Sequence, residues 1–387
     1  MGQLYDFVKN ANGNTNAYKY GLSMITREKR IPYSLYLQLT PYCNLKCKMC
    51  YARMEPEEIR TAGKHVMSFG EWKYYIDEGL KLGSQMLALT GGECTLHPEF
   101  EKIYTYAYDA GMELYVMTNL TNVTESIYRL WLEKPPASIS FTVYGATSKS
   151  YAVLCGKADA FSTVYANIEK LMQSGLYIFP KFNAVHDNFQ EIKKVHQFFK
   201  ERQMNVLFGG NLLNFGKCNS VTIEQEKVES DHFSEFMFEK WCDDNNRSYE
   251  EGKEIELKSL ERRYLNRGKN QHFKGLRCGA ARNTCHINWM GEMTPCVALD
   301  AFKKDPRKEG FRECWEQMCS WADDVPVITE CEECIFKSKC ISCTAYHYHD
   351  TGVFGEPSHR LCWKRIHPDK ATEMEAEIIR RVRQNES

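Results

Sequence analysis

The chain has 387 residues, and its 50 basic and 51 acidic side chains almost cancel. A balanced charge gives no general electrostatic attraction to nucleic acid or to an anionic membrane surface. The sequence also lacks an apolar run of membrane-spanning length and the basic-then-apolar pattern of a secretion signal. We therefore expect a cytoplasmic protein that has neither nucleic acid nor a membrane as its partner.

Segments with the character of strands and of helices alternate between residues 33 and 215. Short runs rich in β-branched, aromatic and aliphatic residues predict strands at 33–40, 85–90, 112–118, 138–144, 177–185 and 205–213. Helical periodicity predicts helices at 69–82, 99–110, 163–174 and 188–202. Because strands that alternate with helices form parallel sheets, we predict an α/β fold. Six units would make a partial (β/α)6 TIM-like barrel with its chemistry at the carboxyl ends of the strands.

The composition changes after this predicted barrel. Residues 216–275 are highly charged and helical in pattern, and we interpret them as a bridge of solvated helices. From 276 to 365 the periodicity weakens and cysteines dominate, which is typical of a small domain held together by metal. Residues 366–387 predict a C-terminal amphipathic helix, and residues 1–32 form an extension before the first strand.

Cysteine is the unusual component, with 17 in the chain. In a large protein without a secretion signal, metal ligation explains so many thiols better than disulfides do. Three of them, Cys43, Cys47 and Cys50, directly follow the first predicted strand. Eight more form a C-terminal array: Cys278, Cys285, Cys296, Cys331, Cys334, Cys340, Cys343 and Cys362. A disulfide framework would give no reason for this division into two groups.

The N-terminal triplet has the spacing C-x3-C-x2-C. Thiolates are the ligands of iron–sulfur clusters, and three of them leave one iron of a four-iron cube open, as a catalytic centre requires. A second motif, Thr90-Gly91-Gly92-Glu93, ends the second predicted strand. Its two glycines would let the backbone approach a ligand closely. The triplet alone also fits part of a zinc site, but the combination of the two motifs favours a cluster.

Together, the triplet and the glycine pair resemble the radical S-adenosylmethionine (SAM) superfamily. The resemblance implies a catalytic [4Fe-4S] cluster whose open iron is chelated by SAM, and the cleavage of SAM to a 5′-deoxyadenosyl radical. It also implies contacts between SAM and individual residues. Met49 would pack on the adenine, the segment of Gly91, Gly92 and Glu93 would bind the amino group, and Asn119 and Thr142 would line the ribose and carboxylate.

The C-terminal array, with Gly291 five residues before Cys296, resembles the SPASM domain of radical SAM enzymes that modify peptides and proteins. Eight cysteines suit two fully ligated auxiliary [4Fe-4S] clusters. The chain departs from the family in having two residues rather than three between Cys340 and Cys343, which could rearrange the ligands. A pair of structural zinc knuckles is the alternative. By resemblance, one cluster would take Cys278, Cys285, Cys296 and Cys343, and the other Cys331, Cys334, Cys340 and Cys362.

Six cysteines belong to neither group, and we interpret most of them as small buried hydrophobes. Cys94 and Cys155 follow strands on the side expected to hold the active site. Either is therefore a candidate for the hydrogen-atom donor that radical epimerases need.

The two resemblances imply a radical SAM enzyme that abstracts a hydrogen atom from a ribosomal precursor peptide and forms a thioether or carbon–carbon crosslink. An auxiliary cluster would accept the electron that the substrate radical releases. The resemblance implies an electron donor such as flavodoxin or ferredoxin. Because residues 1–32 are too few for a leader-binding domain, a separate leader-binding protein or direct recognition of the substrate would be required.

Three alternatives remain open at this point. A sulfatase-maturing enzyme is the runner-up, although such relatives carry an aspartate directly after the third cysteine of the array. Here Val297 follows Cys296, and the nearest acid is Asp300. A peptide epimerase is the second alternative. A non-catalytic electron-transfer or zinc-scaffold protein is the third, and it would leave the segment from Gly91 to Glu93 without a purpose.

Overall fold

Eight strands form a single sheet in the computed structural model, which describes residues 15–216, 218–268 and 274–385. Their order across the sheet is β6-β5-β4-β3-β2-β1-β7-β8. Neighbouring strands are parallel, except β7 and β8, which are antiparallel. The strands are β1 (Ser34–Gln38), β2 (Met86–Thr90), β3 (Glu113–Thr118), β4 (Ser138–Thr142), β5 (Ile178–Asn183), β6 (Leu207–Gly209), β7 (Thr284–Ile287) and β8 (Met293–Thr294).

The first six strands confirm the predicted α/β partial barrel. Each lies inside its predicted range, and each strand from β2 to β6 pairs with the strand before it in the chain. The sequence analysis does not predict β7 and β8, which extend the sheet beyond β1. With four and two residues, these strands are too short to show an alternating pattern. The sheet therefore continues into the segment that was predicted to be a separate C-terminal domain.

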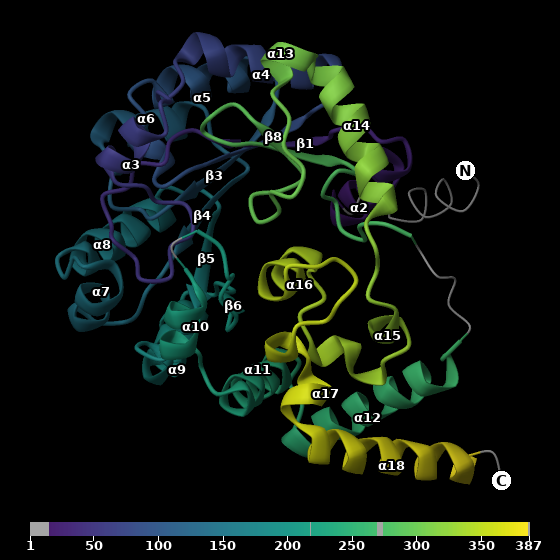
Figure 1. Cartoon of the computed structure of the whole chain (residues 1–387). Coiled ribbons are helices and arrows are strands. Elements are labelled where there is room, and N and C mark those ends of the chain that lie inside the picture. Colours follow the sequence, from purple (N-terminus) through teal and green to yellow (C-terminus); the bar gives the residue numbers. More distant parts are fainter. Residues whose placement is uncertain (1–14, 217, 269–273, 386–387) are drawn as a thin grey trace.

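Helices cover the outer face of this sheet, as Figure 1 shows for α4, α5, α6 and α8. Leu35 and Leu37 of β1 pair in register with Leu87 and Leu89 of β2, and all four side chains are fully buried against this layer. Alternate residues face the barrel interior. The helices of this part are α2 (Thr15–Glu28), α3 (Pro56–Thr61), α4 (Phe69–Lys81), η1 (Cys94–Leu96), α5 (Phe100–Asp109), α6 (Glu125–Glu133), α7 (Ser148–Cys155), α8 (Ala160–Gln173), η2 (Phe189–Glu191) and α9 (Ile192–Lys200).

Helix α2 lies within the predicted N-terminal extension, of which residues 1–14 lie outside the described part of the chain. The predicted bridge consists of α10, α11 and α12, and α18 is the predicted C-terminal helix. No helix among the described residues is both long enough and apolar enough to cross a membrane. The helices after the barrel are α10 (Ser220–Glu226), α11 (Ser230–Asp244), α12 (Tyr249–Leu265), α13 (Pro306–Glu309), α14 (Phe311–Asp324), α15 (Thr329–Glu332), η3 (Ile335–Lys339), α16 (Thr344–Thr351), η4 (His359–Leu361), α17 (Trp363–Ile366) and α18 (Pro368–Asn385).

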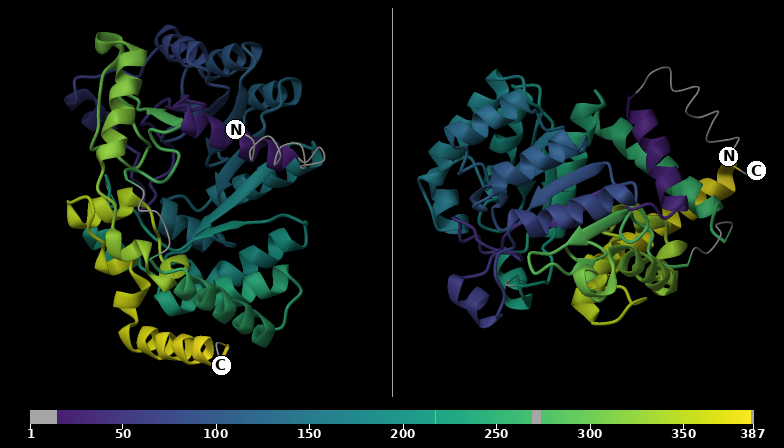
Figure 2. Two further views of the ribbon diagram at one scale, coloured as in Figure 1. Left: turned by 90° about the vertical axis from the view of Figure 1, so that its right-hand side faces the viewer. Right: turned by 90° about the horizontal axis from the view of Figure 1, so that it is seen from above.

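A second, smaller core holds the C-terminal part together. Helix α18 lies along α12 (Figures 1 and 2). Between them Leu260 and Ile378 pack with Phe336 and Trp363, which belong to the cysteine-rich segment. The cysteine-rich segment is therefore supported by helices from both the bridge and the C-terminus.

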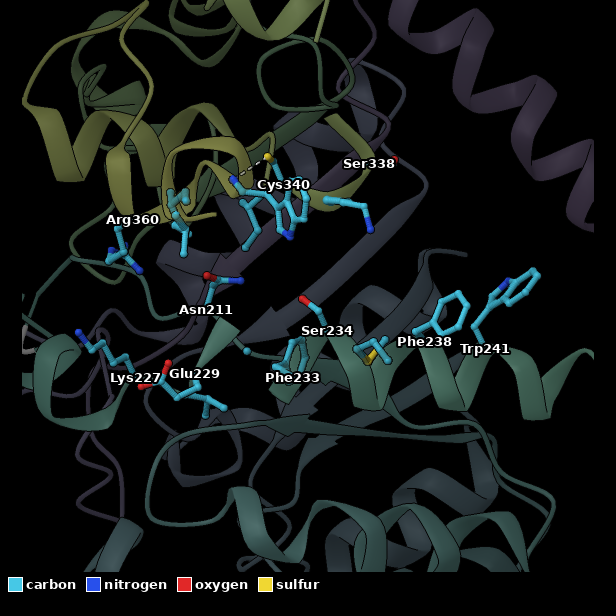
Figure 3. A pocket seen from close by; sticks show the side chains of 18 of the residues that line it. Asn211, Lys227, Glu229, Phe233, Ser234, Phe238, Trp241, Ser338, Cys340 and Arg360 are labelled. Atoms are coloured by element: carbon cyan, nitrogen blue, oxygen red, sulfur yellow. Dashed lines mark hydrogen bonds between the residues drawn. The ribbon is translucent and has the colours of Figure 1, made fainter. Parts of the chain in front are cut away.

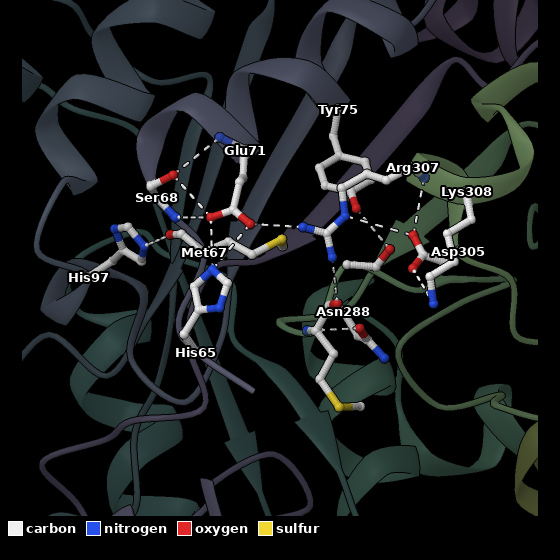
Figure 4. A network of polar contacts seen from close by, with 12 residues as sticks. His65, Met67, Ser68, Glu71, Tyr75, His97, Asn288, Asp305, Arg307 and Lys308 are labelled. Carbon is white, nitrogen blue, oxygen red and sulfur yellow. Dashed lines mark hydrogen bonds and ion pairs between the residues drawn. The ribbon is translucent and has the colours of Figure 1, made fainter. Parts of the chain in front are cut away.

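A polar network joins the β7–β8 hairpin to helix α4 of the barrel (Figure 4). Arg307 Nη1 donates to Glu71 Oε1 at 2.8 Å, and Arg307 Nη2 donates to the Met290 carbonyl at 3.3 Å. Tyr75 Oη donates to the Gly291 carbonyl at 2.9 Å. These bonds attach the hairpin that leads into the C-terminal cysteine array to the barrel.

Gly291 is required at the turn of this hairpin for two physical reasons. Its φ is +85°, a conformation that side chains disfavour. A Cβ at this position would also lie 2.5 Å from Tyr75 Oη and 2.8 Å from Arg307 Nη2. The glycine that precedes Cys296 therefore serves the docking of the hairpin.

Replacing Gly291 with alanine should destabilise the protein more than the same change at Gly111. Both residues have φ of +85°, but nothing lies within 4 Å of a Cβ built on Gly111. The left-handed conformation costs about 1–2 kcal/mol in either variant, and the collision with Tyr75 adds about 1–3 kcal/mol at Gly291 alone. Urea unfolding followed by circular dichroism measures the difference, and equal losses would show that the collision has no effect.

Candidate active site

The loop after β1 carries the three N-terminal cysteines, all of them half-buried. The Leu45 N–H donates to Cys43 Sγ at 3.5 Å, and the Arg53 N–H donates to Cys50 Sγ at 3.2 Å. Hydrogen bonds to a sulfur favour its anionic form. The backbone of this loop is therefore arranged to stabilise thiolates.

Burial of the loop acts against that charge. It raises the pKa of Cys43 to about 12 and the pKa of Cys50 above its usual range, whereas a hydrogen bond with Cys155 lowers the pKa of Cys47. A bound metal removes the proton from such a thiol. Within the described ranges, no three His, Cys, Asp or Glu side chains converge as ligands of one metal ion. A four-iron cube takes its ligands at separate corners, so three spaced thiolates fit its donor set.

Gly91 and Gly92 dock the end of β2 onto the cysteine loop. The Gly92 N–H donates to the Thr40 carbonyl and the Glu93 N–H to the Tyr42 carbonyl, each at 2.7 Å. A Cβ on Gly91 would lie 2.6 Å from the Thr40 oxygen, and one on Gly92 would collide with the Tyr42 carbonyl. The sequence analysis attributes the glycines to the approach of a ligand, but here the backbone that approaches them is that of the cysteine loop.

Glu93 is fully buried where β2 and β3 end. Its Oε1 accepts from Thr118 Oγ1 at 2.8 Å and from Thr95 Oγ1 at 2.7 Å, and its Oε2 accepts from the Asn119 N–H at 2.7 Å. Since both oxygens accept from donors within the chain, the carboxylate fixes the two strand ends relative to each other. It thereby fixes the ends of β2 and β3 next to the cysteine loop.

Replacing Glu93 with glutamine should cost about 2–4 kcal/mol of stability. The amide has an NH2 group in place of one carboxylate oxygen, so the donors that bond to that oxygen would lose their buried acceptor and face N–H groups instead. The matched control is Glu101→Gln on the exposed face of α5, where we expect a change of less than about 0.5 kcal/mol. Chemical unfolding of both variants tests this. A glutamine at Glu93 that is tolerated as well as one at Glu101 would contradict the structural role.

The structure brings two of the other predicted SAM contacts to the cysteine loop. Asn119 Nδ2 donates to Asn44 Oδ1 at 3.0 Å and lies 3.5 Å from Cys43 Sγ. Met49 is in the loop itself and is largely buried in the main core. Thr142 is the last residue of β4, one strand further along the sheet. Their contacts with SAM stay predictions.

The two candidate hydrogen-atom donors lie in different surroundings. Cys155 is the last residue of α7 and lies against Cys47. Cys94 is fully buried, and its Sγ donates to the Met117 carbonyl at 3.3 Å. A role in hydrogen-atom transfer stays a prediction for both.

Two polar residues near this site have no role in the sequence analysis. Tyr144 follows β4, and its Oη lies 3.1 Å from Cys47 Sγ. Lys181 of β5 pairs in register with Thr142, and burial lowers its pKa. The signal that could have identified them is their position at the carboxyl ends of barrel strands, where functional side chains gather.

Four of the C-terminal cysteines form one group. Cys331 lies near Cys334, Cys340 and Cys362, and burial together with these neighbouring thiols raises the pKa of Cys331 to about 11. The Trp363 N–H donates to Cys340 Sγ at 3.1 Å. This is the same set that the sequence analysis assigns to one auxiliary cluster.

The other predicted set is brought together only in part. Cys296 lies near Cys278 and Cys343, and burial together with these neighbours raises the pKa of Cys296 to about 12. Cys285 is not in this group, because it lies on β7 in register with Leu35 and faces the outer helix layer.

The surroundings of Cys285 are those of a core residue. It is fully buried and interacts with Cys314 and Cys319 of α14. Successive side chains of a strand point to opposite faces, so the register with β1 determines which way Cys285 points. Sequence order alone does not contain that register.

A cavity of about 890 Å³ opens between the end of β6, the bridge helices and the cysteine-rich segment (Figure 3). Its walls include Asn211 after β6, Phe233 and Trp241 of α11, and Cys340 and Arg360 from the C-terminal part. Because the cysteine loop also follows the carboxyl end of a strand, it lies on the same side of the sheet as the end of β6. The cavity thus lies beside the end of β6 and is lined by Cys340 of the four-cysteine group, whereas no described residue of the cysteine loop lines it.

Comparison with known proteins matches residues 37–209 to the Radical SAM superfamily. The AdoMet-dependent heme synthase of Methanosarcina barkeri (strain Fusaro / DSM 804) is 25% identical over 343 residues, which cover 84% of this chain and 95% of the relative. The antilisterial bacteriocin subtilosin biosynthesis protein AlbA of Bacillus subtilis (strain 168) is 22% identical over 329 residues, or 82% of this chain and 68% of AlbA. The structure of Streptococcus suis SuiB bound to its precursor peptide SuiA has the same fold, with a TM-score of 0.63, 14% identity, and coverage of 87% of this chain and 77% of SuiB.

Proposed function

We propose, from the premise that this chain is a radical SAM enzyme whose superfamily domain spans residues 37–209, that it modifies a ribosomally made precursor peptide. The expected product is a thioether or carbon–carbon crosslink. The observation that carries this proposal is the four-cysteine group beside a cavity at the barrel mouth. Crosslinking removes two hydrogen atoms, so a second electron must leave the substrate, and a nearby cluster can accept it.

The N-terminal site would hold the catalytic cluster on Cys43, Cys47 and Cys50. SAM would bind at its open iron, between the Gly91–Glu93 segment, Asn119 and Thr142, with Met49 against the adenine. When bound, the cluster and SAM supply the radical that abstracts a hydrogen atom from the substrate.

The chain itself positions these groups and excludes water from them. The glycine pair presses the end of β2 onto the cysteine loop, and Glu93 fixes the neighbouring strand end through the Asn119 N–H. The side chains of Leu45 and Met49 are largely buried, so apolar packing encloses the inner side of the loop. A reactive radical needs such enclosure, since water and stray donors would quench it.

The C-terminal groups would hold two auxiliary [4Fe-4S] clusters. Cys331, Cys334, Cys340 and Cys362 would ligate one cluster completely. Cys278, Cys296 and Cys343 would ligate the other, with one ligand position that no cysteine of the group fills. A flavodoxin or ferredoxin would supply electrons, and a separate leader-binding protein would present the peptide.

Two comparisons support a peptide as the substrate. AlbA is named for bacteriocin biosynthesis, and SuiB is seen with a precursor peptide. The cavity also offers apolar and aromatic walls, such as Phe233, Phe238 and Trp241, with polar groups at its rim. Such walls suit the side chains of an inserted peptide segment.

A precursor of heme is the second candidate substrate. The observation that favours it is the heme synthase of Methanosarcina barkeri, which the chain matches over 95% of that protein's length. A sulfatase-maturing reaction is disfavoured because Val297 directly follows Cys296, and the first acid after it, Asp300, pairs its Oδ2 with Lys303 Nζ at 2.9 Å. Epimerisation would require Cys94 or Cys155 to donate a hydrogen atom, and both thiols are buried in the main core.

The deciding experiment combines the anaerobically reconstituted protein with SAM, a reductant and one substrate at a time. The substrates are short peptides encoded beside the gene and an iron–porphyrin precursor of heme. We expect 5′-deoxyadenosine to form and one peptide to lose two hydrogen atoms per crosslink, as measured by mass spectrometry. Conversion of the porphyrin alone would establish the second candidate. Formation of 5′-deoxyadenosine with every peptide unchanged would contradict the proposal.

A further inference from the structure

Helix α7 ends against the cysteine loop. The last carbonyls of a helix have no partner within it, and two of them accept from the loop. The Lys46 N–H donates to the Cys155 carbonyl at 2.8 Å. The Lys48 N–H donates to the Leu154 carbonyl at 2.9 Å. These bonds lie on either side of Cys47, so the end of α7 fixes the position of this cysteine.

Two side chains from the same part of the fold reach the sulfur of Cys47. Tyr144, in the loop between β4 and α7, places its Oη 3.1 Å from Cys47 Sγ, and its ring is held edge-on by Tyr151 at 5.7 Å. Cys155 is 1% exposed, and because its carbonyl accepts from the Lys46 N–H, its thiol lies beside Cys47. A ligating Cys47 has no proton to give, so the hydroxyl and the thiol must both be donors.

Cys47 differs in this respect from the other members of the triplet. Cys43 and Cys50 accept from N–H groups of the loop backbone, and any sequence that folds this way provides those donors. Cys43 is also reached by one side chain, the Asn119 amide at 3.5 Å from its Sγ. Among the described residues, Cys47 is the member of the triplet that a tyrosine hydroxyl and a second thiol approach, and specific residues supply both.

We propose that Tyr144 and Cys155 are positioning residues that raise the reduction potential of the catalytic cluster through their hydrogen bonds to Cys47. Reduction adds one electron to the cluster and makes its sulfurs more negative, so a donor to sulfur stabilises the reduced state more than the oxidised state. The inference rests on the ligand assignment made under the proposed function. It gives Cys155 a task other than hydrogen-atom donation.

The test is a redox titration of the reconstituted full-length protein followed by electron paramagnetic resonance. The signal to follow is the one that changes when SAM is added, since only the cluster with an open iron binds SAM. In Tyr144→Phe and in Cys155→Ala we expect the ratio of reduced to oxidised cluster at a fixed potential to fall about tenfold, a shift of about 59 mV for one electron. Cys155→Ser keeps a donor and should restore the wild-type value.

Tyr104→Phe is the control, because it removes a hydroxyl that donates to the Lys134 carbonyl rather than to the cysteine loop. Unchanged potentials in Tyr144→Phe and Cys155→Ala, with full iron content, would overturn the inference and leave the proposed function intact. The absence of any SAM-sensitive signal in the wild type would instead overturn the ligand assignment, and both proposals with it. Equal potentials in Cys155→Ser and Cys155→Ala would show that packing rather than the hydrogen bond is responsible.

Discussion

Replacing Cys50 with alanine should abolish the cleavage of SAM and remove about four of the irons bound per chain. Replacing a residue that hydrogen-bonds to a metal ligand typically lowers metal affinity or activity about 10–100-fold. Replacing the ligand itself should therefore lower the rate of SAM cleavage by more than about 100-fold. The Arg53 N–H, which donates to Cys50 Sγ at 3.2 Å, would also lose its acceptor. Iron analysis and the rate of 5′-deoxyadenosine formation measure the two effects.

Cys242→Ala is the matched control for this variant. Cys242 is buried in α11 and belongs to neither cysteine group. Its Sγ packs against Gly252, where an added Cβ would lie 2.5 Å from the sulfur. Its replacement removes one sulfur from a packed interior, so we expect a modest loss of stability and unchanged iron. If Cys50→Ala retained its iron and its cleavage rate, the triplet would not be the catalytic ligand set.

The barrel could be predicted because every one of its parallel strands buries at least one face, and β2 and β4 are buried along most of their length. Such strands appear in a sequence as short apolar runs, and all six runs became β1 to β6. Helical periodicity also predicted α4, α5, α8 and α9, whereas the sequence analysis names no helix at α6 or α7. The hairpin of β7 and β8 could not be found in this way, since two very short strands among cysteines carry no pattern. Their place beside β1 depends on long-range pairing.

The candidate site shows the same division between local and long-range information. The cysteine loop and the glycine pair are contiguous motifs, so the sequence reveals them. Packing between segments far apart in the chain decides which backbone Gly92 contacts. It also decides which face of β7 carries Cys285. The contacts of Tyr144 and Cys155 with Cys47 also depend on where α7 ends in space. These features emerge only from the fold.

Replacing Cys340 with alanine should uncouple SAM cleavage from product formation. The variant should lose about four irons per chain, keep forming 5′-deoxyadenosine, and yield at least about 100-fold less crosslinked peptide. The reason is that Cys340 lines the cavity and belongs to the four-cysteine group, whereas the N-terminal cysteine triplet is untouched. The yield of product per 5′-deoxyadenosine measures the coupling directly. If 5′-deoxyadenosine formation and crosslinked peptide fell by the same factor, the cluster at the four-cysteine group would have a purely structural role.

Cys285→Ala is the matched contrast to Cys340→Ala. Cys285 and Cys340 belong to one array in the sequence but have different surroundings in the fold. Cys285 faces α14 and interacts with Cys314 and Cys319, so its replacement should leave the iron content unchanged. We expect only the cost of a small cavity, about 1–2 kcal/mol in urea unfolding.

If Cys285→Ala lost as much iron as Cys340→Ala, the eight-cysteine ligand set would hold and β7 would have to present Cys285 to the opposite face. Full iron in Cys285→Ala beside a clear loss in Cys340→Ala would instead assign seven cysteines to the auxiliary clusters. One cluster would then keep a ligand position open to a group other than these thiols.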